Sequence, residues 1–503
     1  MNRPEILDRI RKRTEPWDII VIGGGATGVG CSVDAASRGY DVLLLERHDF
    51  GKGTSSRSTK LIHGGVRYLR QGNISLVREA LKERAILLRN ALHVVKKQSF
   101  IVPCYSVWQK LYYGAGLKIY DLLSGKYSFG RSRILSKTAT IAELPSLKTE
   151  GLSGGILYYD GQFDDMRLLI DLVTTAHQQS AAILNYASVT SISKNDTGKV
   201  SGVYFEDIET GEMFSISAKA VINATGAFCD NVRTMSDEGA KPIVTLSQGI
   251  HLVFDRKFLP SGTAVMIPKT SDGRVLFCIP WLGVTLVGTT DTPIKQAEME
   301  PQALESEIDF VLETAGKYLS EKPTREDILS IFVGIRPLVK SGVARNTASL
   351  SRGHTIEIDA SGMITITGGK WTTYRHMAVD AIDQAAKLGS LDIRPSTTEN
   401  LKIASPNIAS VGSGEKLHPD LPYTRDDVIR AIRDEMARTV EDVLARRTRA
   451  LFLNAGAAIE IAPKVAEIMA EESGKDLAWK EKQVDQFIRL AQRYQINWPR
   501  MHE

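Results

Sequence analysis

The sequence feature that most constrains the fold is the run Gly-Gly-Gly-Ala-Thr-Gly at residues 23–28, which lies between two apolar stretches. The apolar stretch before it, residues 19–22, is typical of a buried parallel strand, and the small residues after it, up to Arg38, are typical of a helix. A second apolar stretch, residues 42–45, ends at the carboxylate of Glu46. This order of strand, glycine turn, helix, strand and acid predicts a dinucleotide-binding βαβ unit rather than a glycine turn without a ligand.

Each glycine of the run has its own task in such a unit. Gly23 allows the tight turn, Gly25 lets the backbone approach a pyrophosphate, and Gly28 lets the helix pack on the strands. The first helical turn, which includes Thr27, then presents unpaired N–H groups to the phosphates. Glu46 lies where a carboxylate accepts hydrogen bonds from a ribose diol. The pattern by itself fits FAD and NAD equally.

Length and composition narrow the class of protein further. The 503 residues are enough for two or three domains. The net charge of +4, from 63 basic and 59 acidic residues, gives no reason to expect a nucleic-acid partner. The four cysteines are widely spaced, which predicts reduced, buried thiols in a cytosolic setting. The sequence has no apolar stretch typical of a secretory signal or of a membrane-spanning helix, so we expect neither.

Three later stretches also have glycines where a nucleotide or a flat ring could lie. Residues 51–69 are rich in hydroxyls, glycines and cations, and they form either a solvated loop or one that wraps around a cofactor; the position after the βαβ unit favours the second. An apolar strand at 220–225 ends in Gly226. Residues 364–375 contain a strand, paired glycines and a helix that starts near Thr372, which predicts a second phosphate- or ring-facing helix terminus.

Residues 103–137 combine aromatic and basic side chains. The aromatic residues are Tyr105, Trp108, Tyr112, Tyr113, Tyr120 and Tyr127, and the cations are Lys110, Lys118, Lys126, Arg131, Arg133 and Lys137. This mixture suits a membrane–water boundary with anionic lipid, and it also suits an ordinary solvated surface over a partly apolar helix pair. Both interpretations remain open at this point.

Taken together, these stretches resemble the FAD-dependent, quinone-reducing glycerol-3-phosphate dehydrogenases. The resemblance runs through residues 23–28, 58–69, 223–226, 279–281, 288–291, 334–338, 368–375 and 445–449, so it covers nearly the whole chain. It implies an α/β fold (α+β mixed), with a glutathione-reductase-like FAD domain interleaved with a D-amino-acid-oxidase-type substrate domain and followed by a C-terminal helical domain.

The implied domain boundaries alternate along the chain. The FAD domain takes residues 14–80, 151–242 and 333–393; a substrate or cap region with a candidate membrane-facing segment takes 81–150; the substrate-domain sheet takes 243–332; a linker takes 394–424; and the helical domain takes 425–503.

The resemblance also implies roles for individual residues. The cofactor-binding set is Gly23, Gly25, Thr27, Gly28, Glu46, Thr54, Ser55, Lys60, His63, Gly65, Gly226, Asp291, Gly369 and Thr372, with Thr54, Ser55, Lys60, His63 and Gly65 along the pyrophosphate and flavin. The substrate-binding set is Arg67, Tyr68, Arg336, Arg352 and Lys370. Four cations in the second set suit a phosphate group, although a single arginine of this kind would more often form a surface salt bridge.

Two residues are expected to be catalytic. His251 is a candidate proton acceptor, because an imidazole with a pKa near neutrality can take a proton from an alcohol. A structural histidine inside the strand layer is the competing interpretation. Arg336 is expected to be a catalytic residue as well as a substrate-binding one.

The implied activity is oxidation of sn-glycerol 3-phosphate to dihydroxyacetone phosphate, with FAD as cofactor and a membrane quinone as electron acceptor. The protein would then be cytoplasmic and peripherally attached to the inner face of the cell membrane, with a homodimer as a candidate assembly. We see none of the calcium-binding loops of mitochondrial members and expect no metal. No extra mid-chain insertion of the related oxidases is found either, which favours quinone over oxygen. A peroxide-forming oxidase and a non-catalytic flavin-binding scaffold are the alternatives.

Overall fold

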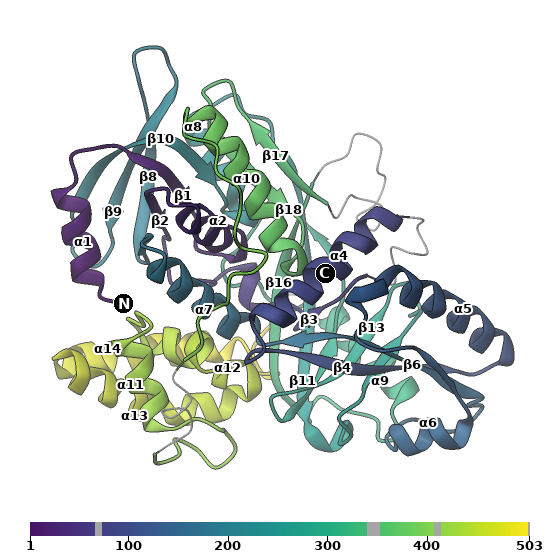
Figure 1. Ribbon diagram of the computed structural model, residues 1–503. Helices are drawn as coiled ribbons and strands as arrows, with labels where there is room; N and C mark the ends of the chain where they lie inside the picture. Colours follow the sequence, from purple (N-terminus) through teal and green to yellow (C-terminus); the bar gives the residue numbers. More distant parts are fainter. Residues whose placement is uncertain (66–72, 340–352, 407–413, 501–503) are drawn as a thin grey trace.

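The computed structural model describes residues 1–65, 73–339, 353–406 and 414–500. Two sheets, each with its own helices, lie side by side, and the C-terminal helices lie beneath the first of them (Figure 1). All four cysteines are buried and unpaired, as predicted.

The first sheet is the nucleotide-binding one. Its strands, in spatial order, are β17 (His354–Ile358), β18 (Ile364–Gly368), β10 (Met213–Asn223), β1 (Trp17–Ile22), β2 (Val42–Leu45) and β7 (Ala182–Leu184), with β8 (Ala187–Lys194) and β9 (Val200–Asp207) attached through β10. Its helices are α1 (Arg3–Lys12), α2 (Ala26–Ser37), α7 (Asp165–Gln178), α8 (Cys229–Ser236) and α10 (Tyr374–Leu388). The strands from β18 to β7 run parallel, and nearly every residue of β1 and β2 is buried, with α2 packed against both strands.

Gly28 shows why the helix after the glycine run requires small residues. A Cβ atom at this position would lie 1.9 Å from the carbonyl oxygen of Gly23, so any side chain would push α2 away from β1. Gly23 itself has φ +110°, a conformation that favours glycine. The predicted packing task of Gly28 is therefore met in the structure.

The second sheet is mixed and mostly antiparallel. Its strands, in spatial order, are β15 (Thr292–Ile294), β11 (Val244–Asp255), β14 (Val284–Gly288), β13 (Leu276–Trp281), β12 (Ala264–Ile267), β4 (Val95–Cys104), β6 (Gly154–Phe163) and β3 (Leu61–Ile62), with β16 (Ile328–Val339) on β11 and β5 (Arg133–Leu135) on β6. Its helices are α4 (Ile74–Asn90), α5 (Val107–Ser124), α6 (Lys137–Glu143) and α9 (Glu305–Tyr318).

Three strands differ from the boundaries expected from the sequence. β6 falls within the 151–242 segment assigned to the FAD domain, but it pairs along its whole length with β4 and so belongs to the second sheet. β3 also leaves the first sheet to pair with β6, although it lies within residues 14–80. β16 crosses the boundary at residue 333 without interruption, because it pairs with β11 along most of its length.

The C-terminal domain is helical, as expected. It contains α11 (Arg425–Arg433), a π-helical turn at Asp442–Arg447, α12 (Ala450–Leu453), α13 (Ala455–Ser473) and α14 (Leu477–Gln492). Its apolar residues share one core with strands of the second sheet, including β13 and β16, so this domain packs firmly on the rest of the chain.

Candidate active site

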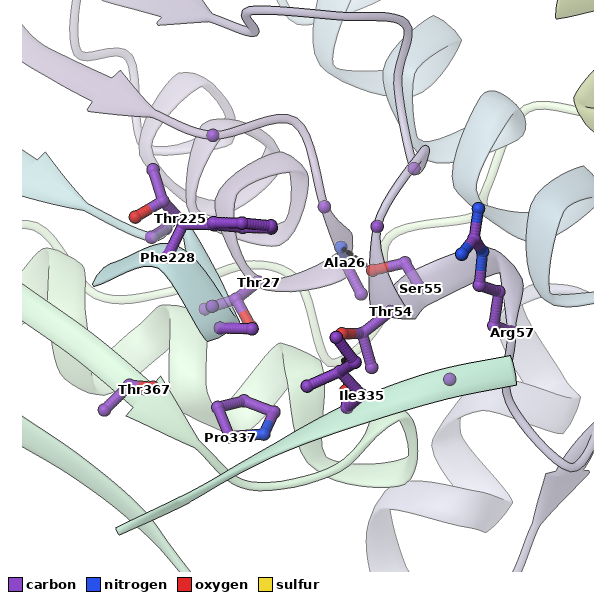
Figure 2. A pocket seen from close by; sticks show the side chains of 18 of the residues that line it. Ala26, Thr27, Thr54, Ser55, Arg57, Thr225, Phe228, Ile335, Pro337 and Thr367 are labelled. Carbon is purple, nitrogen blue, oxygen red and sulfur yellow. Dashed lines mark hydrogen bonds between the residues drawn. The ribbon is translucent and has the colours of Figure 1, made fainter. Parts of the chain in front are cut away.

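A cavity with a volume of about 670 Å³ lies at the carboxyl ends of the parallel strands. Such an edge is where open parallel sheets bind nucleotides. Its walls come from the glycine turn after β1, the segment after β2, the end of β10, β16 and the turn after β18 (Figure 2). Strands of both sheets and segments far apart in the sequence therefore meet around this one cavity.

The start of α2 faces this cavity. Gly25 precedes the helix and lines the cavity together with Ala26 and Thr27. The N–H of Ala26 donates to the hydroxyl of Ser55 at 2.9 Å, and Figure 2 shows Ser55 facing the start of the helix. A Cβ atom at Gly25 would meet that hydroxyl oxygen at 3.1 Å, so only glycine fits without a shift. This helix terminus has the geometry that suits a pyrophosphate.

Glu46 also lines the cavity, and its carboxylate is already oriented. One oxygen accepts a hydrogen bond from the N–H of Gly24 at 2.6 Å and the other from the N–H of His48 at 2.8 Å. Burial raises the pKa of this carboxyl above its usual value. Further donors at this position, such as the hydroxyls of a ribose, would stabilise the charged form.

Two side-chain contacts join the segment after β2 to other walls of the cavity. Thr54 donates from its hydroxyl to the carbonyl of Ile335 at 2.7 Å (Figure 2), and the indole N–H of Trp371 donates to the carbonyl of Ser55 at 2.8 Å. Gly226 and Gly369, both with φ near +60° to +70°, bring two further backbone segments to the cavity without a side chain.

His251, on β11, is buried at the cavity wall. It is 2 % exposed, its ring stacks on Phe332 with centroids 4.8 Å apart, and its Nε2 lies 3.0 Å from the hydroxyl of Thr59. Burial, together with the positive charges of Lys60 and Arg336, holds the pKa of this imidazole well below its usual value. The ring is therefore neutral at neutral pH, which is the form that a proton acceptor needs.

Arg336, on β16, lies at the junction of the large cavity and a smaller one. Its guanidinium donates to the carbonyl of Gln248 at 3.1 Å, the hydroxyl of Thr289 at 3.0 Å and the carbonyl of Thr290 at 2.9 Å. It also lies 3.5 Å from Asp291. These contacts fix the direction of a cation that lines both cavities.

The smaller cavity has a volume of about 160 Å³ and contains a cation that sequence reasoning missed. Arg274, just before β13, lines it and donates to the backbone carbonyl of Asp291. Nothing in the turn Ser271–Gly273 marks the next residue as special. Only the pairing of β13 with β14, which leads to Asp291, brings Arg274 beside Arg336.

Most predicted site residues line one of the two cavities. The large cavity is lined by Gly23, Gly25, Thr27, Glu46, Thr54, Ser55, His63, Gly226, His251, Arg336, Gly369, Lys370 and Thr372. Gly65 and Asp291 line only the smaller cavity, so the structure sets them apart from the rest of the expected cofactor set. Arg67, Tyr68 and Arg352 lie outside the described residues.

Lys60 is the clearest correction to the predicted site. It does not line either cavity but is fully buried behind the wall, where its ammonium donates to Asp165 at 2.6 Å and to the carbonyl of Ser56 at 2.7 Å. Burial lowers the pKa of this amine to about 7. Its positive charge lowers the pKa of His251 from behind the wall, so Lys60 supports the site rather than lining it.

Known proteins are similar to this chain in sequence and in fold. A family model described as FAD dependent oxidoreductase matches residues 18–375, and one described as the C-terminal domain of alpha-glycerophosphate oxidase matches residues 396–484. The mitochondrial glycerol-3-phosphate dehydrogenases of Rattus norvegicus and Homo sapiens are 40% and 39% identical, over 96% of this chain and 74% of each relative.

Solved structures agree with these sequence matches. The glycerol-3-phosphate dehydrogenase from Bacillus halodurans, complexed with FAD, superposes with a TM-score of 0.79 and 28% identity over 99% of both chains. The L-alpha-glycerophosphate oxidase from Mycoplasma pneumoniae reaches a TM-score of 0.59 at 18% identity over 78% of this chain and 100% of its own, which shows a shared fold.

The fold and the cavity thus define an FAD-dependent oxidoreductase. The glycine turn, the α2 terminus and the Glu46 carboxylate fit that cofactor, because they offer a close backbone approach, phosphate donors and an acceptor for ribose hydroxyls. Within this class, the chain belongs to the family of FAD-dependent glycerol-3-phosphate dehydrogenases. The predicted fold class, cofactor and family are confirmed.

Proposed function

We propose that this enzyme oxidises sn-glycerol 3-phosphate to dihydroxyacetone phosphate and passes the electrons to a membrane quinone. The observation that carries the substrate proposal is the position of Arg336 at the junction of the two cavities, beside Arg274 and near the neutral imidazole of His251. Guanidinium groups suit a phosphate because their planar N–H donors match its oxygens. The small cavity suits a three-carbon phosphate rather than a nucleotide.

The proposed reaction breaks the C2–H and O–H bonds of the substrate and forms a C=O bond. Arg336 and Arg274 hold the phosphate, and Lys370, which lines the large cavity, adds a third positive charge. His251 takes the proton of the C2 hydroxyl on its imidazole, while Thr59 orients the ring through the 3.0 Å contact. When bound, FAD supplies the two-electron acceptor for the hydride from C2.

The acceptor proposal can be tested by product analysis. We expect purified holoenzyme with sn-glycerol 3-phosphate to reduce a water-soluble quinone under nitrogen, and in air to release little hydrogen peroxide. Glycerol, which lacks the phosphate, is the matched control and should give neither product. Peroxide formed in a one-to-one ratio with the substrate consumed, whether or not quinone is present, would replace the dehydrogenase by an oxidase.

The surface that we propose for membrane attachment is one face of α5. Its apolar side chains recur at helical spacing and point outward: Val107, Trp108, Leu111, Tyr112, Ile119 and Leu122, of which Trp108 and Leu122 are 80% exposed. The opposite face, with Leu117 and Tyr120, is buried, and the helix lies at the outer edge of the second sheet (Figure 1). An amphipathic helix of this kind lies flat in a lipid interface.

Some of the basic residues on and after this helix bond to the backbone, and others are exposed. Lys110 and Lys118 donate to backbone carbonyls of Ser153 and Ser132, so they serve the fold. Lys126, Arg131, Arg133 and Lys137, in the segment that follows the helix, are exposed, and their positive charge favours anionic lipid. Among the described residues, no helix is both long enough and apolar enough to cross a bilayer.

Placing aspartates at Trp108 and Leu122 should detach the enzyme from vesicles. Because burying a large apolar side chain contributes about 1.5–3 kcal/mol, losing two should lower partitioning at least about a hundredfold. Wild-type enzyme should sediment with vesicles that contain phosphatidylglycerol, and the double variant should stay in the supernatant with its dye-linked activity unchanged. Leu477→Asp, an exposed leucine of α14, is the control and should still sediment. Wild-type enzyme that never sediments would remove this surface from the proposal.

A further inference from the structure

Three arginines of the C-terminal domain reach into the nucleotide-binding domain. Arg446 and Arg447 end the π-helical turn at Asp442–Arg447, and Arg449 follows two residues later. All three are buried, and each is paired with the segment 47–60 that follows β2 or with a residue beside it. We call residues 47–59 the cavity loop, because most of them line the large cavity.

The first anchor of the cavity loop is Asp49. Arg447 donates to both of its carboxylate oxygens, at 2.7 and 2.8 Å, and the Nε of Arg446 donates to one of them at 2.6 Å. Burial alone would raise the pKa of the Asp49 carboxyl, but the two guanidinium groups hold it below its usual value. The carboxylate is therefore charged and fixed in two directions by one neighbouring domain.

The second anchor is the backbone carbonyl of Ser56. The guanidinium of Arg449 donates to it at 2.8 Å and lies 3.4 Å from the carboxylate of Asp165. The ammonium of Lys60 donates to the same carbonyl and the same carboxylate, so the end of the loop is held by a closed set of charged groups. Between the anchors, Lys52 pairs with Glu441 at 2.9 Å.

The two anchor residues, Asp49 and Ser56, do not face the cavity. Asp49 and Ser56 are absent from its lining, whereas Gly51 to Ser55 between them line it, including Ser55, which meets the start of α2. The N–H of Gly51 donates to the carbonyl of Gly24 at 3.0 Å, so a shift of the loop would move the glycine turn as well. The arginines thus hold the back of the loop whose front faces the cofactor site.

We propose that Arg446, Arg447 and Arg449 are positioning residues for FAD, through which the C-terminal domain holds the cavity loop in the shape that receives the pyrophosphate. Buried ion pairs add little stability compared with apolar residues of the same size, and some fix one conformation instead. This assigns a task to the sequence Ala-Arg-Arg-Thr-Arg at 445–449 and does not depend on which substrate the enzyme oxidises.

The test measures FAD affinity and stability separately in Arg447→Gln, Asp49→Asn and the double variant. FAD is removed, the apoprotein is titrated with FAD by flavin fluorescence, and the melting temperature is recorded with and without FAD. We expect each single variant to raise the Kd for FAD at least about tenfold, and the double variant to raise it little further, because both changes break the same contact. Arg433→Gln, an exposed arginine of α11 paired with Glu472, is the matched control and should keep the wild-type Kd.

A purely structural role gives a different result. In that case the variants would melt earlier by the same amount with and without FAD, and the Kd would stay within about twofold of the wild type, which would overturn the proposal. Arg449→Lys provides a milder second variant, because it keeps a positive charge near Asp165 but shortens the reach to Ser56. A raised Kd in Arg449→Lys supports the proposal, and a wild-type Kd contradicts it.

Discussion

Replacing Arg336 with alanine is expected to raise the KM for sn-glycerol 3-phosphate about a hundredfold while FAD stays bound. The guanidinium is held in place by Gln248, Thr289 and Thr290, so its charge is already aimed when the substrate arrives. Hydrogen bonds to charged groups contribute about 1.5–3 kcal/mol each, and loss of two of them corresponds to this factor or more.

The matched control for this prediction is Arg325→Ala. Arg325 is a partly exposed arginine that pairs with Glu305 and Asp309 on the surface, so its loss should leave KM within about twofold, as for most exposed ion pairs. Arg336→Lys should recover part of the affinity, since the charge returns without the planar donors. An unchanged KM in Arg336→Ala would show that the phosphate binds elsewhere.

His251→Asn is expected to lower kcat by about two to four orders of magnitude, the range for removal of a general base. Asparagine is smaller than histidine and its amide falls at the position of the imidazole Nδ1, so the contact of Nε2 with Thr59 and the stacking on Phe332 are lost together with the base. FAD should stay bound, and the melting temperature is recorded to separate a loss of turnover from a loss of stability. His418→Asn, in the C-terminal domain, is the control and should retain full turnover.

The pH profile adds a readout that a structural role would not change. Because burial, Lys60 and Arg336 hold the pKa of His251 below 6.5, wild-type kcat should stay constant on acidification past that value and then fall as the imidazole is protonated. A phosphate monoester takes up its second proton near pH 6, about equally for enzyme and variant, so the comparison isolates the histidine. Turnover of His251→Asn that equals the wild type across pH would leave this residue a structural one.

The part of the fold that is local in sequence could be predicted. Residues 17–46 contain the strand, turn, helix and strand in one continuous stretch, and the close approach of Gly28 to Gly23 is built into their spacing. β6 could not be assigned in the same way, because its residues fit a strand of either sheet and only the partner β4 decides. Sheet membership depends on pairing between distant segments, which a local pattern does not contain.

The candidate site also contains residues that could be predicted from local sequence and residues that could not. Glycines such as Gly25 and Gly369 could be assigned to the site from the sequence, since a backbone that must approach a ligand excludes a side chain. Lys60 looks like a cofactor contact among hydroxyls and glycines, yet Asp165 draws its ammonium behind the wall. Arg274 and Arg447 gave no signal of their task, because the residues that they meet, Asp291 and Asp49, are brought to them only by the folded chain.

The most direct test of the proposed activity is anaerobic addition of sn-glycerol 3-phosphate to the purified holoprotein while the visible flavin band is recorded. We expect the band to bleach in proportion to the substrate added, dihydroxyacetone phosphate to form in equal amount, and glycerol to leave the band unchanged. A band that keeps its full intensity at saturating substrate, with FAD still bound to the protein, would contradict the proposed oxidation.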